Sequence, residues 1–315
     1  MEPTWKDSIY AQREQLARLL HQPLADLAGR CAAAWGDRER LNEVLAEGFP
    51  QIPHCTFLYC LGTDGLQLSD NLGAQGVKPG YFGRDRSDRP YMREPVPPWG
   101  FLLSDAYISL SQQRPSLTAL QLVWRDGQVL GYLGADFDLR GLPVTAELYQ
   151  EPEAWRQVKG DPAIRGTLFQ QCRVDSPLDR HLDQALSILE ELLTQRGVFQ
   201  CQIHFSSSQA LIWTLDDPYR YRILDQEALS DPDICLVYPP RPYPTDAAIS
   251  SESVGAVLSR LRALRFADEN IYLRQSSINL FNGMVSLTFS CDGSHYMPHD
   301  QFLNSGTAFW FGAAG

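Results

Sequence analysis

The sequence lacks the long apolar runs, the basic excess and the paired cysteines that mark several large protein classes. No apolar run in its 315 residues approaches the roughly 20 residues needed to span a bilayer. The net charge of −11 leaves no surplus of Lys and Arg for phosphate groups, which predicts a protein that does not bind nucleic acid. Because the N-terminus becomes amphipathic without an apolar leader, we expect a cytoplasmic protein.

Motifs for catalysis and for disulfide pairing are also missing. Seven cysteines are an odd number, and several lie in apolar runs such as residues 55–60, so we expect free buried thiols. There is no phosphate-binding glycine loop, no Gly-x-Ser-x-Gly turn, no His-Glu-x-x-His pair and no zinc spacing of cysteines. We therefore expect no cofactor, no bound metal and no enzyme activity.

The length and the 44% hydrophobic content favour two domains of the α+β class. We expect an N-terminal helix at 1–36, a first domain at 37–143, a linker at 144–175 with a short helix near 152–158, and a second α+β domain at 176–315. Apolar residues at helical spacing, with Pro23 among them as a kink, predict the first helix. Asp37 is expected to cap the second.

Strand and turn patterns fill both halves of the chain. In the first half we expect strands at 56–59 and 66–69 and a hairpin of 117–124 with 128–137 around Asp126-Gly127. In the second half, Ser176 and Pro177 predict the start of one helix running through 192. Strands at 198–205, 210–215 and 235–238, a helix at 251–264 and a hairpin on Asn282-Gly283 follow, without an internal repeat.

Three consecutive elements between residues 84 and 142 stand out by their order and spacing. They are the steps Arg89-Pro90-Tyr91, Ser104-Asp105-Ala106-Tyr107 and Gly131-Tyr132-Leu133-Gly134-Ala135-Asp136. Together they resemble the double-Cache, or PDC, family of PAS-like ligand-binding domains found in chemoreceptors and sensor kinases. The resemblance covers a little under half of the chain and implies an antiparallel PAS-like sheet over residues 37–143, preceded by helices.

The resemblance also implies a binding site. In family members that bind amino acids, an arginine and an aromatic residue hold the carboxylate, while a tyrosine and an aspartate hold the ammonium group. These positions correspond to Arg89, Tyr91, Tyr107 and Asp136, and a guanidinium fork does match a carboxylate. Arg84 stands where the family has an aromatic residue, and we add it to the site. With Arg84 and Arg86 near Arg89, a dicarboxylate is as plausible a ligand as an amino acid.

Each of these residues also has a structural interpretation. The charged residues at 84–89 would, taken alone, be exposed ion pairs on a loop, and only the spacing of Arg89 favours a ligand contact. Asp136 is alternatively a structural partner of an arginine, and Tyr91 and Tyr107 are alternatively core aromatics.

The leading hypothesis is a cytoplasmic sensor of a small anionic molecule, coupled to a C-terminal responder domain. The N-terminal helix would form a homodimer or transmit the signal to a downstream signalling protein of unknown identity. One alternative is an enzyme with a site at Cys291, His295 and His299, although Pro298 interrupts the helix that would align the two histidines. Another alternative is an interaction scaffold without a ligand.

Overall fold

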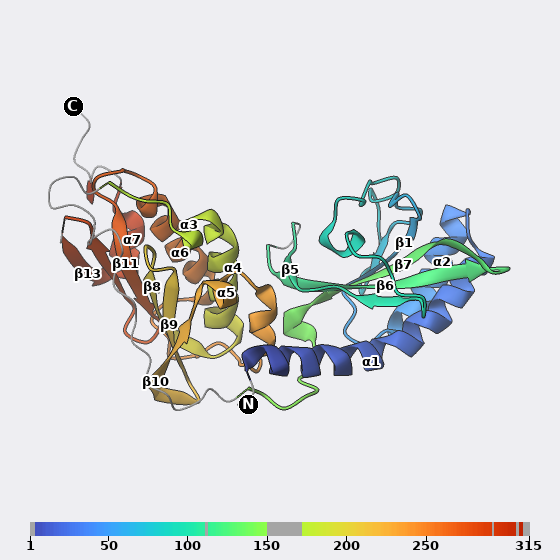
Figure 1. The fold of residues 1–315 in the computed structure, drawn as a ribbon, viewed down its shortest axis with the longest axis horizontal. Helices are drawn as coiled ribbons and strands as arrows, with labels where there is room; N and C mark the ends of the chain where they lie inside the picture. The colour runs from blue at the N-terminus through green and yellow to red at the C-terminus, as the bar shows by residue number, and fades with distance from the viewer. Residues whose placement is uncertain (1–3, 111–112, 150–171, 292, 307–308, 311–315) are drawn as a thin grey trace. The chain divides into compact units, whose positions relative to one another are not determined.

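The computed structural model describes residues 4–110, 113–149, 172–291, 293–306 and 309–310. The chain divides into two compact units, Met1–Tyr149 and Gln150–Gly315. Each contains an antiparallel sheet with helices packed against it, so the expected α+β class is confirmed (Figure 1). None of the helices in the described ranges is long and apolar enough to cross a membrane. The predicted short helix at 152–158 lies outside the described residues.

The first unit begins with two helices and continues with a seven-stranded antiparallel sheet. Its helices are α1 (Trp5–Ala33) and α2 (Arg38–Gly48), with short 3-10 helices η1 (Phe49–Gln51), η2 (Pro90–Met92) and η3 (Leu139–Gly141). Its strands are β1 (Phe57–Gly62), β2 (Asn71–Gly73), β3 (Gly76–Lys78), β4 (Phe101–Leu103), β5 (Tyr107–Ile108), β6 (Pro115–Arg125) and β7 (Gln128–Asp138). The sheet order is β3-β2-β1-β7-β6-β4, and β5 also pairs with β6.

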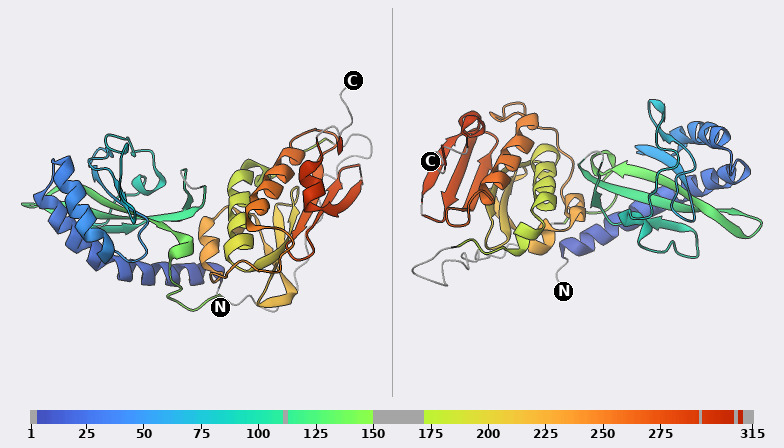
Figure 2. Two further views of the ribbon diagram at one scale, coloured as in Figure 1. Left: turned by 180° about the vertical axis from the view of Figure 1, so that it is seen from behind. Right: turned by 90° about the horizontal axis from the view of Figure 1, so that it is seen from above.

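Helix α1 covers one face of this sheet with its predicted apolar stripe (Figure 2). Leu16, Leu20, Leu24 and Leu27 are each at most 2% exposed, and the helix packs mainly on β6. Each buried leucine contributes roughly 1.5–3 kcal/mol to folding. Pro23 lies inside the helix, where it has no N–H for a backbone bond one turn back, and the helix is curved (Figure 1).

One buried side chain joins α1 to the end of the first unit. Gln12 is 3% exposed. Its Nε2 donates to the carbonyl of Pro143 over 2.9 Å, and its Oε1 accepts from the backbone N–H of Thr145 at 2.9 Å and of Ala146 at 2.8 Å. The chain therefore enters and leaves this unit at the same place.

Two local predictions in the first unit are confirmed. The Asp37 carboxylate caps α2 by accepting the backbone N–H of Glu39 and Arg40. Asp126 and Gly127 connect β6 and β7 with φ of 53° and 77°, as a two-residue hairpin turn with two left-handed residues requires.

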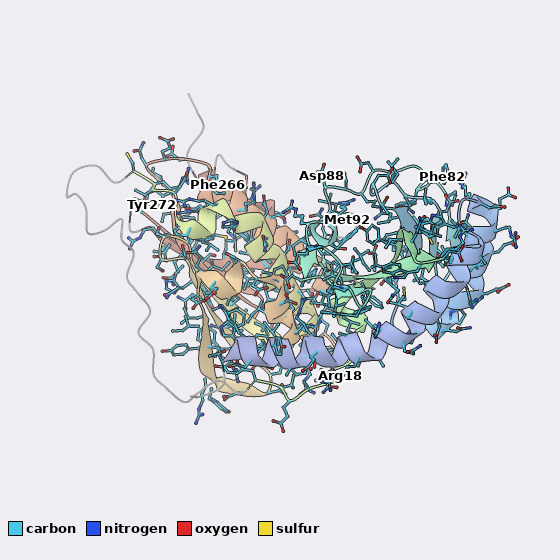
Figure 3. The ribbon with its side chains drawn as sticks, turned by 45° about the vertical axis from the view of Figure 1, so that its right-hand side comes forward. Arg18, Phe82, Asp88, Met92, Phe266 and Tyr272 are labelled. Atoms are coloured by element: carbon cyan, nitrogen blue, oxygen red, sulfur yellow. The ribbon has the colours of Figure 1, made fainter. Side chains whose placement is uncertain are left out.

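The two faces of the first sheet differ in chemistry. On β7, Leu133, Ala135 and Phe137 are at most 1% exposed and lie on the face that α1 covers. The alternate residues belong to the other face, which is packed by residues 84–100, called here the covering segment. Figure 3 places Asp88 and Met92 of this segment across the sheet from Arg18 of α1. The predicted site residues of β7 and of the covering segment thus lie on one side of the sheet.

The second unit holds a six-stranded antiparallel sheet. Its helices are α3 (Pro177–Arg180), α4 (Leu182–Gln195), α5 (Gln226–Leu229), η5 (Pro232–Leu236), α6 (Ser251–Arg265) and α7 (His299–Asn304). Its strands are β8 (Val198–His204), β9 (Gln209–Thr214), β10 (Asp217–Leu224), β11 (Leu273–Asn279), β12 (Met284–Phe289) and β13 (Ser294–Pro298). The predicted hairpin on Asn282-Gly283 is confirmed as β11 and β12.

The strand order β10-β9-β8-β11-β12-β13 contains a repeat of topology. Helix α4 precedes the three strands of one half, helix α6 precedes the three of the other, and β8 pairs with β11 at the centre. The two helices pack on each other and on β8 and β11. We expected no internal repeat, and the sequences of the halves show none, because the shared topology needs only similar apolar patterning.

Three predicted elements are wrong in detail. Residues 66–69 form isolated bridges and no strand, since the hydroxyl of Ser69 takes the N–H of Cys60 that a neighbouring strand would bond. The helix expected from Ser176 through 192 divides at His181, whose φ of −122° leaves the helical region. Residues 235–238 form the end of η5 and the turn after it, because Asp231 caps a helix with Pro232 at its first position. Strands β10 and β13 were not expected.

Candidate ligand-binding site

The floor of the candidate site consists of residues in register on three adjacent strands. Thr118 of β6 pairs directly with Asp136 of β7, and Phe57 of β1 pairs with Asp136 on its other side. Tyr59 of β1 is opposite Gly134. Because paired residues of neighbouring strands share a face, these side chains lie on the face under the covering segment.

Asp136 is a half-buried carboxylate with two hydroxyl donors on one oxygen. Its Oδ1 accepts from the hydroxyls of Tyr59 and Thr118, each at 2.7 Å. Burial raises the pKa of this carboxyl above its usual value, although both hydrogen bonds and the charges of Arg86 and Arg89 oppose the shift. Oδ2 accepts no hydrogen bond from any residue of the described ranges, so half of the carboxylate is available for another donor.

The next residue on the same face has a structural role. Asp138 accepts the backbone N–H of Arg140 at the start of η3 and lies 3.8 Å from the guanidinium of Arg114. Asp138 therefore interacts with other residues of the fold, whereas Asp136 has one oxygen that accepts no hydrogen bond from the described residues.

Arg89 lies at the start of η2 in the covering segment. Because Pro90 follows it, its backbone is held extended, with φ of −69° and ψ of 147°. The side chain is half-buried, and its charge acts to lower the pKa of Asp136. Within the described part of the chain its guanidinium makes no hydrogen bond or ion pair. The charge of Arg89 thus acts on the carboxylate of Asp136 without an ion pair between the two side chains.

Tyr91 and Tyr107 complete the set that the sequence predicts. Tyr91 is 2% exposed, and its ring centre is 5.9 Å from that of Tyr107. The hydroxyl of Tyr107 lies 2.6 Å from that of Thr118, which itself donates to Asp136. Burial raises the pKa of both phenols, so they are neutral at physiological pH. Tyr91, Tyr107 and Asp136 lie in one cluster through Tyr59 and Thr118, and the charge of Arg89 acts on the carboxylate of Asp136.

A small pocket adjoins this cluster. Its volume is about 20 Å³, enough for a water molecule. It is lined by Thr56, Phe57, Tyr107, Ser109, Ser116, Asp136, Phe137 and Asp138.

Arg84 is not brought into the cluster. Its side chain is exposed, and its guanidinium lies 4.3 Å from the ring centre of Tyr81. The buried arginine is Arg86, which is 7% exposed. The prediction that this charge run consists of exposed ion pairs is wrong for Arg86, because its guanidinium enters the core and contacts neutral partners.

Sequence reasoning missed Tyr59 and Thr118, and it counted Arg86 only as a charge near Arg89. Tyr59 is fully buried, with its ring against Gly134; a Cβ at position 134 would lie 2.3 Å from Cε2 of the ring. The signal for Tyr59 and Thr118 was the alternation of β1 and β6, which becomes informative only once the register with Asp136 is known.

The alternative cluster near the C-terminus does not form a metal site in the described ranges. His295 lies on β13 with its ring against those of Phe289 and Trp310, at 5.9 and 5.1 Å. Cys291 is exposed after β12, and His299 begins α7. Among the described residues, no three His, Cys, Asp or Glu side chains are placed to share an ion.

No protein-family profile matches the chain, and no curated protein matches it. Solved structures do match part of it. An extracellular ligand-binding receptor from Desulfohalobium retbaense is 13% identical, with 45% of this chain and 26% of the receptor covered and a TM-score of 0.34. The sensory domain of the Campylobacter jejuni chemoreceptor Tlp3 with isoleucine bound is 14% identical, with 45% and 60% covered and a TM-score of 0.35.

The ligand-binding domain of the Pseudomonas fluorescens chemoreceptor CtaA, in complex with L-isoleucine, is 16% identical, with 42% of this chain and 52% of that domain covered and a TM-score of 0.32. The chain spans less than two thirds of the length of each of these three proteins. The expected likeness to chemoreceptor sensor domains is thereby confirmed as a structural match over less than half of the chain. With TM-scores this low, the chemistry of the site is argued from the residues of this chain.

Proposed function

We propose that the first unit is a sensor domain that binds a small molecule carrying a carboxylate and an amino group. The observation that carries this proposal is the pairing of two incompletely used charges. Asp136 has one carboxylate oxygen without a donor, and Arg89 has a guanidinium without an acceptor, both judged within the described residues. An amino acid supplies both missing partners, the ammonium to Asp136 and the carboxylate to Arg89.

The tyrosines support the same orientation of the ligand. The hydroxyls of Tyr59 and Thr118 hold Oδ1 of Asp136 and leave Oδ2 for an ammonium group. The aromatic rings of Tyr91 and Tyr107 supply apolar walls for the carbon skeleton. In this half-buried setting a charged hydrogen bond contributes roughly 1.5–3 kcal/mol to binding.

Ligand binding would be linked to a conformational change. Because the pocket next to Asp136 has a volume of about 20 Å³, we expect the residues around it to open when an amino acid enters. The residues that follow the covering segment are attached to α1: the guanidinium of Arg13 donates to the carbonyl of Leu103 in β4 at 2.9 Å and lies 3.0 Å from the carboxylate of Asp105. A ligand that favours the open state thereby also favours any position of α1 that accompanies it.

The second unit would respond to this change as the output part of the protein. The cytoplasmic location, the homodimer through the N-terminal helix and the unknown downstream signalling protein stay predictions. No feature of the described residues favours an enzymatic function strongly enough to propose one.

A thermal-shift screen of the full chain with amino acids, dicarboxylates and hydroxy acids tests the proposal. A ligand that binds only the folded state at 100 times its dissociation constant stabilises that state by about 2.7 kcal/mol and raises its melting temperature. We expect Arg89→Ala to weaken the binding of the best amino acid by roughly 10- to 100-fold, because a charge-assisted pair is lost.

Arg93→Ala is the matched control, since Arg93 is exposed and follows η2 directly. It should bind the ligand with wild-type affinity and keep the wild-type melting temperature. The proposal is wrong if no amino acid stabilises the wild type, or if one stabilises Arg89→Ala equally well.

A further inference from the structure

Arg86 is a buried cation without a contacting anion. Its Nε donates to the Oε1 of Gln67 at 2.9 Å, Nη1 donates to the hydroxyl of Tyr91 at 3.3 Å, and Nη2 donates to the Oδ1 of Asn71 at 3.2 Å. All three acceptors are neutral. A guanidinium has five N–H groups, so two of them have no acceptor among the described residues.

This arrangement is costly unless something else compensates the charge. An ion removed from water loses several kcal/mol of solvation, and buried charges are normally paired or bound to a ligand. The ring of Tyr59 lies against the guanidinium at 4.6 Å and offers only a partial compensation. The nearby phenols of Tyr59 and Tyr91 and the carboxylate of Asp136 outweigh burial and raise the pKa of Arg86, so the group stays charged.

Arg86 belongs to the same site as Asp136. Tyr59 contacts both: its ring lies against Arg86 and its hydroxyl donates to Asp136. Tyr91 links Arg86 to the aromatic cluster under the covering segment. With Arg86 and Arg89 positive and Asp136 negative, the three groups sum to a charge of +1. A simple zwitterion leaves that charge in place, whereas a ligand with one further acid group neutralises it.

We propose that the ligand is an acidic amino acid, whose second carboxylate is bound by Arg86. This inference rests on the proposed function, in which the ammonium group binds Asp136 and one carboxylate binds Arg89. It adds that the second carboxylate of the ligand binds Arg86. The two N–H groups of Arg86 that have no acceptor among the described residues are available to that carboxylate. Gln67 and Asn71 hold the guanidinium in place before the ligand arrives.

The test compares acid and amide pairs of equal shape on the wild-type full chain by calorimetric titration. The probes are L-aspartate with L-asparagine and L-glutamate with L-glutamine. We expect one acid to bind roughly 10- to 100-fold tighter than its amide, because only the acid forms the charge-assisted contact. This comparison needs no variant and so does not depend on the folding of one.

Arg86→Gln extends the test. It should reduce the acid-to-amide preference to less than about threefold while the amide keeps an affinity within about threefold of wild type, and Arg86→Lys should recover part of the preference. Arg93→Gln is the control, with an unchanged preference. Equal binding of acid and amide to the wild type would refute the role of Arg86 and leave the proposed function standing. The absence of binding by any amino acid would refute both.

Discussion

The buried arginines of the two units are used in different ways. In the second unit, the Arg265 side chain is fully buried and donates to both carboxylate oxygens of Asp179, at 2.8 and 2.7 Å. Arg196 is paired with Glu191 in the same unit at 3.2 Å, with both side chains almost fully buried. In the first unit, Arg86 has neutral acceptors. The buried arginines of the second unit are neutralised by carboxylates of the same unit, whereas Arg86 is hydrogen-bonded only to neutral groups among the described residues.

The carboxylates of the two units differ in the same way. Burial alone would raise the pKa of Asp179, but the hydrogen bonds and charge of Arg265 lower it below its usual value. For Asp136, burial dominates and the pKa is raised. A lowered pKa means that the fold stabilises the ionised form, whereas a raised pKa means that ionisation costs stability. Such a cost is typical of functional sites.

The largest expected effect is on the stability of the second unit. Asp179→Asn leaves Arg265 charged, buried and without its anion, and should cost roughly 3–5 kcal/mol in the free energy of unfolding. Chemical denaturation followed by circular dichroism measures this loss. Because the chain has two units, the two transitions are fitted separately if they do not coincide.

Asp183→Asn is the matched control for this change. Asp183 forms an exposed pair with Arg262, and the loss of such a pair costs at most about 1 kcal/mol. If Asp179→Asn and Asp183→Asn have equal effects, the buried pair does not hold the second unit together and the comparison between the units fails.

An intermediate effect is expected in the dependence of stability on pH. For Asp136, whose folded pKa is raised, the folded state takes up a proton first as the pH falls, so the first unit gains stability between the folded and the unfolded pKa. For Asp179, whose folded pKa is lowered, the stabilisation is full above the unfolded pKa and is lost as the pH falls through the folded one. Each unit of difference in pKa corresponds to about 1.4 kcal/mol.

Asp136→Asn isolates the first of these contributions, because an amide does not titrate in this range. The variant should be more stable than wild type at neutral pH, less so toward acid pH, and unable to bind an amine ligand tightly. Binding of an amino acid to the wild type should weaken as the pH falls, with release of its proton from Asp136 on binding. A variant that is less stable than wild type at pH 7 would show that ionised Asp136 supports the fold.

The smallest expected effect concerns Arg84, two residues from Arg86. Arg84→Gln removes an exposed cation that lies on the ring of Tyr81, and ligand affinity should change by less than about twofold. Calorimetric titration with the best amino acid measures it beside Arg86→Gln. A loss as large as that caused by Arg86→Gln would show that Arg84 belongs to the binding site, as we predicted from its place in the sequence beside Arg86 and Arg89.

Elements defined by local chemistry were predictable from the sequence. Asp37 caps a helix because its carboxylate satisfies backbone donors within three residues, and Asp126-Gly127 makes a hairpin because its backbone geometry is local. The strand expected at 235–238 failed because a short apolar run fits a strand and a buried 3-10 helix equally well.

The site was predictable only where spacing along the chain carried information. Arg89, Tyr91, Tyr107 and Asp136 were selected by a motif. The structure places Tyr91 and Tyr107 beside Tyr59, whose hydroxyl donates to Asp136, and their role in binding stays a prediction. In the run that contains Arg84 and Arg86, however, no local pattern tells which guanidinium enters the core, since that depends on the neutral acceptors Gln67 and Asn71. Contacts with residues far away in the sequence decide which arginine is buried, and the charge pattern does not reveal those contacts.

Gln12 gives the first unit a mechanical property. Because one amide side chain bonds the first helix to residues 143–146, we expect a shift of α1 along its axis to displace the segment that follows η3. We therefore expect α1 and residues 143–146 to move together. Ser8 and Thr145 add further hydrogen bonds between the same two segments, so several contacts join α1 to residues 143–147.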